Sequence, residues 1–360
     1  MSTLSSGYGC TTDGNIKLSV TNKILVIQTA FPGDAILTLP FIQELKKKKP
    51  QYLIDVLCIP STMEIFEASP AVNSAIPYDK KGKQKSILSF IKFINELKSK
   101  NYDIVYSPHR SVRSALIALN IQAKESYGFD NSNLKFAYKS TVLYEPNSHE
   151  VKRNLAFIGD DYTGERWKII PQIIVSDNAR KKVRDYLTFN KINKFIAIAP
   201  GSVWETKKYP VEYYKSIIDY FVDKKFQIVL IGGEQDKILC ESLQTSSGEN
   251  VFVAAGNFSI IESIELLKSS MLLICNDSAP THLGMCADIP VLTIYCSTVP
   301  EFGFYPYNLK SNFVSYDNLH CKPCGIHGFN KCPIENFNCA KLLKPDQVIM
   351  KAEKLVSDGN

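Results

Sequence analysis

Apolar runs alternate with amphipathic stretches along the first half of the chain. Continuous apolar segments at 23–28 and 102–108 predict buried strands, and apolar positions at helical spacing in 33–49 and 84–99 predict helices. Strands that alternate with helices in this way are typical of a parallel sheet with helices on both faces. The first half is therefore expected to be an α/β unit.

The alternation of strand and helix patterns begins again after a less regular stretch at 130–175. Strands are expected over 195–202 and 226–236, with a helix over 211–224 between them. With 360 residues, the chain is long enough for two cores, so two Rossmann-like parallel-sheet domains that face a cleft are predicted. The expected division is a flexible N-terminal tail over 1–22, domains over 23–172 and 173–344, and a C-terminal helix over 345–360.

Composition and charge narrow the class of protein. The chain is 45% hydrophobic and 22% charged, which is typical of a globular protein, and it has neither an apolar run of membrane-spanning length nor a secretory signal. A cytoplasmic location is expected. The net charge of +6 is too diffuse for nucleic-acid binding but suits an anionic substrate or membrane surface. The run Lys46–Lys49 is either a solvated helix end or a contact for a membrane or phosphorylated acceptor.

Small and polar residues mark the ends of the strands expected in the second half. These ends meet at one edge of a parallel sheet, where helix N-termini can bind phosphates, so a nucleotide diphosphate is predicted there. The residues concerned are Gly201-Ser202, Gly232-Gly233, Ala255-Gly256-Asn257 and Asp277-Ser278-Ala279. Neither a P-loop nor a dinucleotide-binding glycine motif is present. Lys207, just past a strand end, either neutralises a phosphate or is a surface lysine.

Two loops carry candidate chemistry. In "NDSAPTHLG" (276–284), Ser278 and Thr281 can donate to a phosphate or ribose, and His282 falls in the first helical turn. The alternative is that Asp277 caps the helix and His282 is packed in the core. In "KILVIQTAFPGD" (23–34), Asp34 follows a Pro-Gly turn between strand and helix, and it is either a helix cap or a chemical group.

Three segments together resemble a known family. "ILVIQTAFPGDAILTLPFIQELKKKKP", "APGSVWETKKYP" and "NDSAPTHLGMCADIPVLTIY" resemble successive signatures of the bacterial heptosyltransferases, glycosyltransferase family 9. The resemblance implies a GT-B fold with an acceptor-binding first domain, a donor-binding second domain and a last helix that crosses back to the first. It also implies inverting transfer of a heptose from ADP-heptose to the inner core of lipopolysaccharide or lipooligosaccharide, with no metal or other cofactor required.

The resemblance assigns roles to individual residues. Asp34 becomes the catalytic base, kept ionised by its helix-start position, and Lys207 stabilises the leaving diphosphate. Ala279 stands where the family usually has glycine. The expected donor-binding residues are Gly201, Ser202, Lys207, Gly233, Glu234, Gly256, Asp277, Ser278, Ala279 and His282. The expected acceptor-binding residues are Gly33, His109, Arg110 and Arg113, because arginines suit the phosphates and carboxylates of inner-core saccharides. The alternative is that Arg110 and Arg113 are ordinary loop arginines.

Ten cysteines in a chain without a secretory signal indicate a reducing compartment. Four of them, Cys321, Cys324, Cys332 and Cys339, fall within nineteen residues in "CKPCGIHGFNKCPIENFNC", which also resembles a cysteine-bearing segment of the family. A structural zinc site is the less favoured interpretation, because the second pair is not a Cys-x-x-Cys. Reduced cysteines that pack an irregular loop are preferred, so no metal is expected, and the cluster is expected to be structural in either case.

The expected partner is a lipid-linked core oligosaccharide, reached by peripheral contact with the inner membrane. Two alternatives are another GT-B enzyme, such as a different sugar transferase or a nucleotide-sugar 2-epimerase, and a nucleotide-sugar-binding protein without activity. The intact Asp34 and Lys207 argue against the inactive protein. A zinc-stabilised interaction module, a third alternative, does not explain the strand-end pattern.

Overall fold

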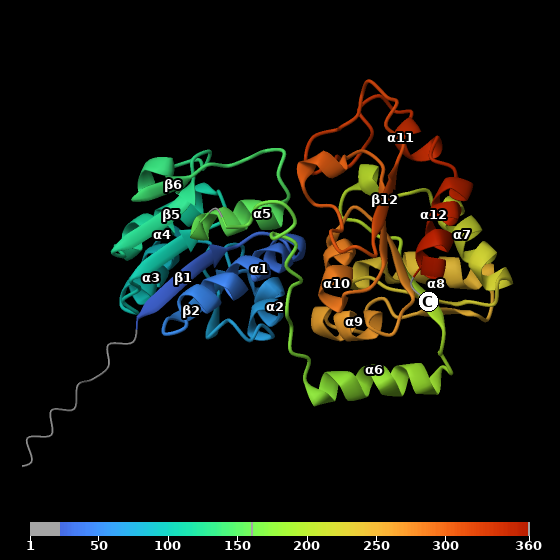
Figure 1. Cartoon of the computed structure of the whole chain (residues 1–360), viewed down its shortest axis with the longest axis horizontal. Helices are drawn as coiled ribbons and strands as arrows, with labels where there is room; N and C mark the ends of the chain where they lie inside the picture. The colour runs from blue at the N-terminus through green and yellow to red at the C-terminus, as the bar shows by residue number, and fades with distance from the viewer. Residues whose placement is uncertain (1–21, 160, 359–360) are drawn as a thin grey trace, which may run out of the picture.

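Two parallel six-stranded sheets form the framework of the protein (Figure 1). The computed structural model describes residues 22–159 and 161–358. The expected N-terminal tail, residues 1–22, therefore lies outside the described residues except for Asn22.

The first sheet has the order β3-β2-β1-β4-β5-β6. Its strands are β1 Lys23–Gln28, β2 Leu53–Cys58, β3 Ser74–Pro77, β4 Ile104–Ser107, β5 Glu125–Phe129 and β6 Ser140–Val142. Its helices are α1 Pro32–Lys48, α2 Met63–Glu67, α3 Ile87–Lys98, α4 Val112–Ile121 and α5 Glu150–Leu155, with short 3₁₀ turns at Pro60–Thr62, Lys135–Ala137 and Ala156–Ile158.

The second sheet repeats this plan in the order β12-β11-β10-β7-β8-β9. Its strands are β7 Phe195–Ala199, β8 Gln227–Leu230, β9 Val251–Val253, β10 Leu272–Asn276, β11 Val291–Tyr295 and β12 Asn312–Ser315. Its helices are α6 Asp177–Phe189, α7 Val211–Asp223, α8 Lys237–Ser247, α9 Ile260–Leu267, α10 Ala279–Ala287, α11 Asn338–Lys341 and α12 Pro345–Asp358, with 3₁₀ turns at Glu205–Lys207, Glu234–Asp236 and Pro300–Phe302. Every strand pairing in both sheets is parallel, as the alternating pattern predicts.

The helices begin at the residues that local chemistry favours. Ser86 precedes α3, and its side chain accepts the N–H of Ser89 at 3.2 Å, which satisfies one of the free donors of the first turn. α1 begins differently: Pro32 opens it with a fixed φ, and its N-cap, Phe31, supplies no side-chain bond. Asp34 lies within the first turn of α1 and is not the N-cap residue.

One apolar core joins the two halves. It contains Ile24 and Val26 of β1, Phe195 of β7 and Leu273 of β10, together with the inner faces of α1, α9 and α10. Helix α1 packs against α10, and α2 packs against α9 (Figure 1). Separate cores cover the outer face of each sheet, under α3 and α4 in the first half and under α7, α8 and α12 in the second. The shared core fixes the carboxyl edges of the two sheets beside each other.

The C-terminal helix differs from the expectation that it crosses back to the first half. α12 packs against α7 and alongside β12, and it buries Val348, Ala352 and Val356 in the outer core of the second sheet (Figure 1). The apolar face of α12 is covered by that sheet and by α7.

The lysines at the end of α1 are engaged locally. The Lys46 Nζ donates to the carbonyl oxygens of Pro50 and Tyr52, and Lys48 pairs with Asp161 at 2.8 Å. These contacts favour the interpretation of Lys46–Lys49 as a helix end. Within the ranges 22–159 and 161–358, no helix combines the length and the apolar character needed to cross a bilayer.

We expect Gly284→Ala to lower the free energy of unfolding by about 1–3 kcal/mol, because a Cβ at this position of α10 would meet the Val291 Cγ2 atom at 2.4 Å. Denaturant titration measures this. Since Val291 supplies the clash, Gly284→Ala combined with Val291→Ala should cost less than the sum of the two single changes. If the losses in unfolding free energy were strictly additive, the Cβ at position 284 would not clash with Val291, and the prediction would be wrong.

Candidate active site

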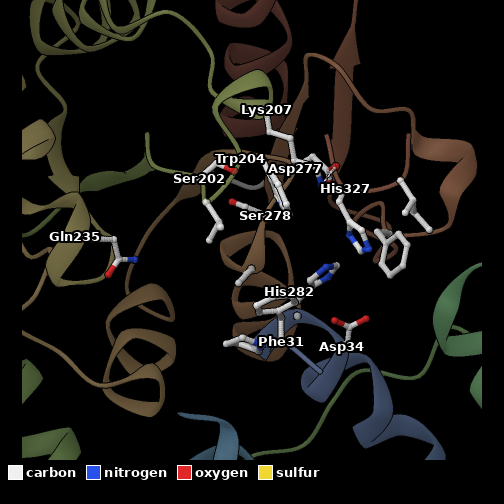
Figure 2. Close-up of a pocket in the computed structure, with 16 residues that line it drawn as sticks. Phe31, Asp34, Ser202, Trp204, Lys207, Gln235, Asp277, Ser278, His282 and His327 are labelled. Atoms are coloured by element: carbon white, nitrogen blue, oxygen red, sulfur yellow. Dashed lines mark ion pairs between the residues drawn. The ribbon is translucent and has the colours of Figure 1, made fainter. Parts of the chain in front are cut away.

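A pocket of about 290 Å³ opens where the two sheet edges meet (Figure 2). Its floor on the first-half side is the start of α1, and its other walls come from the start of α10 and from loops of the second half. The lining residues are Phe31, Pro32, Gly33, Asp34, Ser202, Val203, Trp204, Lys207, Gln235, Asp277, Ser278, Ala279, His282, Phe304, Ile326 and His327. A second cavity of about 420 Å³ shares Ser202, Ser278 and Ala279 with it and continues past the end of β8 to Phe258. The two cavities form one groove across the carboxyl edge of the second sheet, where open α/β sheets bind ligands.

Lys207 and Asp277 form an ion pair in the wall of the pocket. The Lys207 Nζ lies 2.7 Å from an Asp277 carboxylate oxygen, and both side chains are largely buried. The same oxygen accepts the Thr298 hydroxyl at 2.6 Å. The pair thus holds one ammonium group against the pocket in a fixed place (Figure 2).

Asn276 fixes the two loops that carry this pair. Its Oδ1 accepts the N–H of Tyr209 and the hydroxyl of Tyr214, both at 3.0 Å. Its Nδ2 donates to the carbonyl oxygens of Pro200, at 2.8 Å, and Gly201, at 3.2 Å. The buried amide therefore ties the loop after β7, which carries Lys207, to the end of β10, which carries Asp277.

Asp34 lies on the opposite side of the pocket from the ion pair (Figure 2). Burial and, next, the nearby charge of Glu150 raise the pKa of Asp34 to about 7, while backbone N–H groups and Arg110 oppose this rise. The position of Asp34 at the helix start favours the ionised form, but the effect of desolvation on the pKa is larger and opposite. A carboxyl group with a pKa near neutrality can both accept and release a proton.

Glu150 reaches Asp34's neighbourhood because α5 packs on α1. Its carboxylate lies 3.2 Å from Arg153, and burial raises its own pKa against the opposing charges of Arg153 and Arg110. The N–H of Glu150 donates to the carbonyl oxygen of Gly303 at 2.9 Å, so α5 also bonds to a loop of the second half.

His282 stands between Asp34 and the ion pair (Figure 2). Burial lowers its pKa to about 4, with Lys207 adding to this and Asp277 opposing it, so the imidazole is neutral at pH 7. Its Nδ1 is buried and makes no hydrogen bond to any group in the described part of the chain. A Cβ on Gly33 would come within 2.9 Å of the His282 Cδ2 atom, so the histidine packs directly on the Pro-Gly turn.

The remaining predicted donor residues divide into two groups. Gly201, Ser202, Gly233, Ser278 and Ala279 line one or both cavities. Glu234 and Gly256 line neither cavity; instead, the Glu234 carboxylate packs against Gly256, which has a φ of +77°. Thr281 is also turned away, since its hydroxyl bonds to the Thr293 hydroxyl at 3.0 Å inside the core.

Two glycines at strand ends, Gly201 and Gly232, are needed for the packing of a neighbouring side chain, Asp236. A Cβ on Gly201 or on Gly232 would strike the Asp236 carboxylate, at 2.1 Å and 2.7 Å respectively. Asp236 in turn accepts the N–H of Gly233 at 2.9 Å and lines the second cavity. Gly201 and Gly232 thus leave space for the Asp236 carboxylate beside the groove. The sequence pattern did not predict this role of the two glycines.

Of the predicted acceptor residues, only Gly33 lines the pocket. His109 is held by the hydroxyls of Thr29 (2.8 Å) and Ser114 (2.9 Å), and burial lowers its pKa to about 4. The Arg110 guanidinium lies 4.1 Å from the centre of the Tyr144 ring. Arg113 is exposed and donates to the carbonyl oxygen of Lys80 at 3.2 Å.

Sequence reasoning missed the aromatic wall of the pocket. The rings of Trp204 and His327 stack with centroids 6.2 Å apart, and Phe31 and Phe304 add further apolar surface. Trp204 stands inside the quoted motif "APGSVWETKKYP", so its place beside Lys207 was the available signal. No sequence signal placed His327 in the pocket, because it lies in an irregular segment.

The cysteine-bearing segment supports the loop of Lys207. Phe329 exchanges two bonds with Thr206: its N–H donates to the Thr206 hydroxyl at 2.8 Å, and its carbonyl accepts the Thr206 N–H at 3.0 Å. The segment also places His327 in the pocket, so part of it belongs to the site. The cysteines among the described residues are free, and no group of three or more His, Cys, Asp or Glu there could hold a metal ion. The zinc interpretation gains no support from this arrangement.

Comparison with known proteins decides the family. Residues 90–328 match the sequence model of glycosyltransferase family 9 (heptosyltransferase). The chain belongs to this family. It is therefore a glycosyltransferase, as the three sequence segments suggested.

Individual relatives agree with this assignment. The chain is 25% identical over 283 residues to lipopolysaccharide heptosyltransferase 3 of Escherichia coli, covering 74% of this chain and 82% of the relative. The family 9 glycosyltransferase structure from Veillonella parvula superposes with a TM-score of 0.83 at 22% identity, covering 94% of this chain and 98% of that one. The E. coli heptosyltransferase WaaC, solved with ADP-2-deoxy-2-fluoro heptose, gives a TM-score of 0.67 at 17% identity, covering 92% and 99%. These likenesses confirm the GT-B fold of this family 9 member.

We predict that the Asp34 carboxyl titrates with a midpoint near pH 7, measured by carbon NMR and assigned with Asp34→Asn. Glu150→Gln should move this midpoint to lower pH, because it removes a negative charge that favours the protonated form. Glu145→Gln, an exposed carboxylate five residues earlier, is the control and should leave the midpoint unchanged. A midpoint near the ordinary value of 3.8 would contradict the account.

Proposed function

We propose that the protein transfers a heptose from ADP-heptose to the inner core of lipopolysaccharide or lipooligosaccharide, with inversion at the anomeric carbon and with Asp34 as general base. The observation that carries this proposal is the position of Asp34 across one pocket from the Lys207–Asp277 pair. A protein with the same fold binds an ADP-heptose analogue, and a relative is named for lipopolysaccharide.

The proposed reaction is a direct displacement. An acceptor hydroxyl loses its proton to Asp34 as its oxygen forms a bond to C1 of the heptose, and the bond between C1 and the phosphate oxygen breaks. The electron pair of that bond leaves with ADP. Because one carboxyl removes the proton and no side chain becomes attached to the sugar, the new bond forms on the face opposite the departing phosphate.

Lys207 is proposed to stabilise the charge that develops on the leaving diphosphate. Asp277, held by Thr298, keeps the ammonium group in place, and Ser278 and the start of α10 offer donors to the phosphates. The free Nδ1 of neutral His282 is available for a hydrogen bond to the donor. Since Lys207 supplies the positive charge, we propose that no metal is required.

The adenosine is proposed to occupy the second cavity, between the end of β8 and Phe258. Asp236 there can accept hydroxyl groups of a ribose. The lipid-linked core oligosaccharide is proposed to enter from the first-half side, along Arg110 and Arg113. We propose that the reaction takes place at the cytoplasmic face of the inner membrane, where a lipid-linked acceptor would be reached.

The test is acceptor-dependent release of ADP from ADP-heptose, with a heptose-deficient lipid acceptor and with EDTA present in a parallel reaction. Asp34→Asn should lower kcat roughly 10²–10⁴-fold, since it keeps the shape and loses the base. Lys207→Ala should lower kcat roughly 10²–10³-fold. Lys208→Ala, an adjacent lysine paired with the exposed Glu205, is the matched control and should stay within about twofold of the wild type. EDTA should change nothing.

Other results would separate the alternatives. Full activity of Asp34→Asn would show that Asp34 is not the general base, while the protein would still be a transferase. Tight binding of ADP-heptose without turnover on any inner-core acceptor would indicate an inactive binding protein. Turnover only with another nucleotide sugar would indicate a different GT-B enzyme.

The pH dependence follows from the protonation of Asp34. Below its pKa of about 7 the carboxyl is protonated and cannot accept the acceptor's proton, so kcat/KM should fall about tenfold per pH unit on the acid side and level off above pH 7. Rate measurements from pH 5 to 9, with roughly unit spacing, reveal this limb. A profile that is flat from pH 5 to 7 would contradict the assignment.

A further inference from the structure

Helix α3 is apolar over more of its circumference than the core covers. Phe93, Ile94 and Leu97 are buried against the outer face of the first sheet. On the adjoining, outward side, Ile87, Leu88 and Ile91 are 78%, 81% and 49% exposed. Large apolar side chains grouped at helical spacing on a surface indicate an interaction site.

The loop before this helix is strongly basic. Lys81, Lys83 and Lys85 are exposed, and no ion pair in the described residues joins any of them to a carboxylate. The carboxylate of Asp79, the acidic residue that precedes them in the sequence, accepts the N–H groups of Lys81, Gly82 and Lys83 and so stabilises the turn. These N–H groups and the charge of Lys83 hold its pKa below the usual value. We call the three lysines together with Ile87, Leu88 and Ile91 the α3 surface.

The α3 surface lies at the same edge of the first sheet as Asp34. It follows β3, so it begins at the carboxyl edge, where α1 also begins. The Lys80 Nζ donates to the carbonyl oxygen of Thr29 at 3.0 Å, and Arg113 donates to the carbonyl oxygen of Lys80 at 3.2 Å. Thr29 stands five residues before Asp34 in the turn after β1. A short chain of contacts therefore links this surface to the proposed acceptor side.

The chemistry of the α3 surface favours lipid over protein. Interfaces between proteins are depleted of lysine, whereas apolar side chains flanked by lysines suit a bilayer with anionic headgroups. Lys46–Lys49, the densest basic run, lie at the opposite edge of the sheet and are engaged locally.

We propose that the α3 surface docks the enzyme on an anionic lipid bilayer, with Ile87, Leu88 and Ile91 among the headgroups and the three lysines on the lipid phosphates. The docking brings the carboxyl edge of the first sheet, and with it Asp34, to the level of a membrane-borne acceptor. This inference rests on the proposed function only for the nature of that acceptor, because docking itself needs no sugar.

The experiment is co-sedimentation of the full-length protein with vesicles containing about 30% phosphatidylglycerol, compared with vesicles of phosphatidylcholine alone. The wild type should bind the anionic vesicles and be released by high salt. Ile87→Ser/Leu88→Ser/Ile91→Ser should reduce binding roughly tenfold or more, and each lysine-to-alanine change by about fivefold. Phe189→Ser/Ile238→Ser, which replaces apolar residues that are 87% and 81% exposed in the second half, is the matched control and should bind normally.

Two results would overturn the proposal. One is equal binding of the serine triple variant and the wild type. The other is a wild type that stays unbound but forms dimers by light scattering that the triple variant does not form, which would assign this face to a second copy of the chain. Circular dichroism verifies that each variant is folded.

A kinetic arm separates this proposal from the proposed reaction. The serine triple variant should keep wild-type ADP release with a water-soluble, delipidated acceptor and lose activity with a vesicle-borne acceptor. If the proposed reaction is wrong, ADP release fails in both formats while vesicle binding by the wild type persists. Equal activity of the triple variant and the wild type on vesicle-borne acceptor would overturn the docking role.

Discussion

The first turn of α1 lies directly against α10, and glycine at position 33 is what permits this contact. A Cβ there would approach the His282 ring to 2.9 Å, so a larger residue would push the two helices apart. Proline before it starts the helix without a side-chain cap, and aspartate after it faces the pocket. The Pro-Gly-Asp turn thus acts as one unit, and the site spanning both sheets depends on its close approach to α10.

Burial at this junction sets the charges of the site. It raises the pKa of Asp34 to about 7 and lowers that of His282 to about 4, so a neutral imidazole separates a carboxyl near its titration point from a fixed ammonium group. The Lys207 ammonium group is held by the Asp277 carboxylate, which is fixed in turn by the Thr298 hydroxyl. A cation on one side and a proton acceptor on the other suit a reaction in which a hydroxyl is deprotonated as a phosphate departs.

The sequence predicted the elements whose pattern is strong. Helices α1 and α7 and strand β1 begin and end within one residue of expectation, and β7 begins at the expected residue, because their apolar spacing is local information. Short polar elements escaped, such as α5 (EVKRNL) and β6 (STV), since tertiary contacts stabilise them.

The site shows the same division. Asp34, Lys207 and Asp277 stand in motifs at strand ends and meet in one pocket, whereas His327 and Phe304 line it from irregular segments. Glu150 influences the charge of Asp34 only because α5 packs on α1. The charge of Asp34 could not be read from its helix position, because desolvation depends on neighbours far away in sequence. The packing of α12 was predicted wrongly for a similar reason. Its apolar pattern predicts a buried face but does not say which half of the protein covers it, and the structure shows that the second sheet does.

The most direct test of the account is the anomeric configuration of the new glycosidic bond, read by NMR on product made from ADP-heptose of known configuration. One base opposite a fixed ammonium group predicts inversion at C1. Retention would contradict the account, because a single displacement from the face opposite the departing phosphate inverts C1.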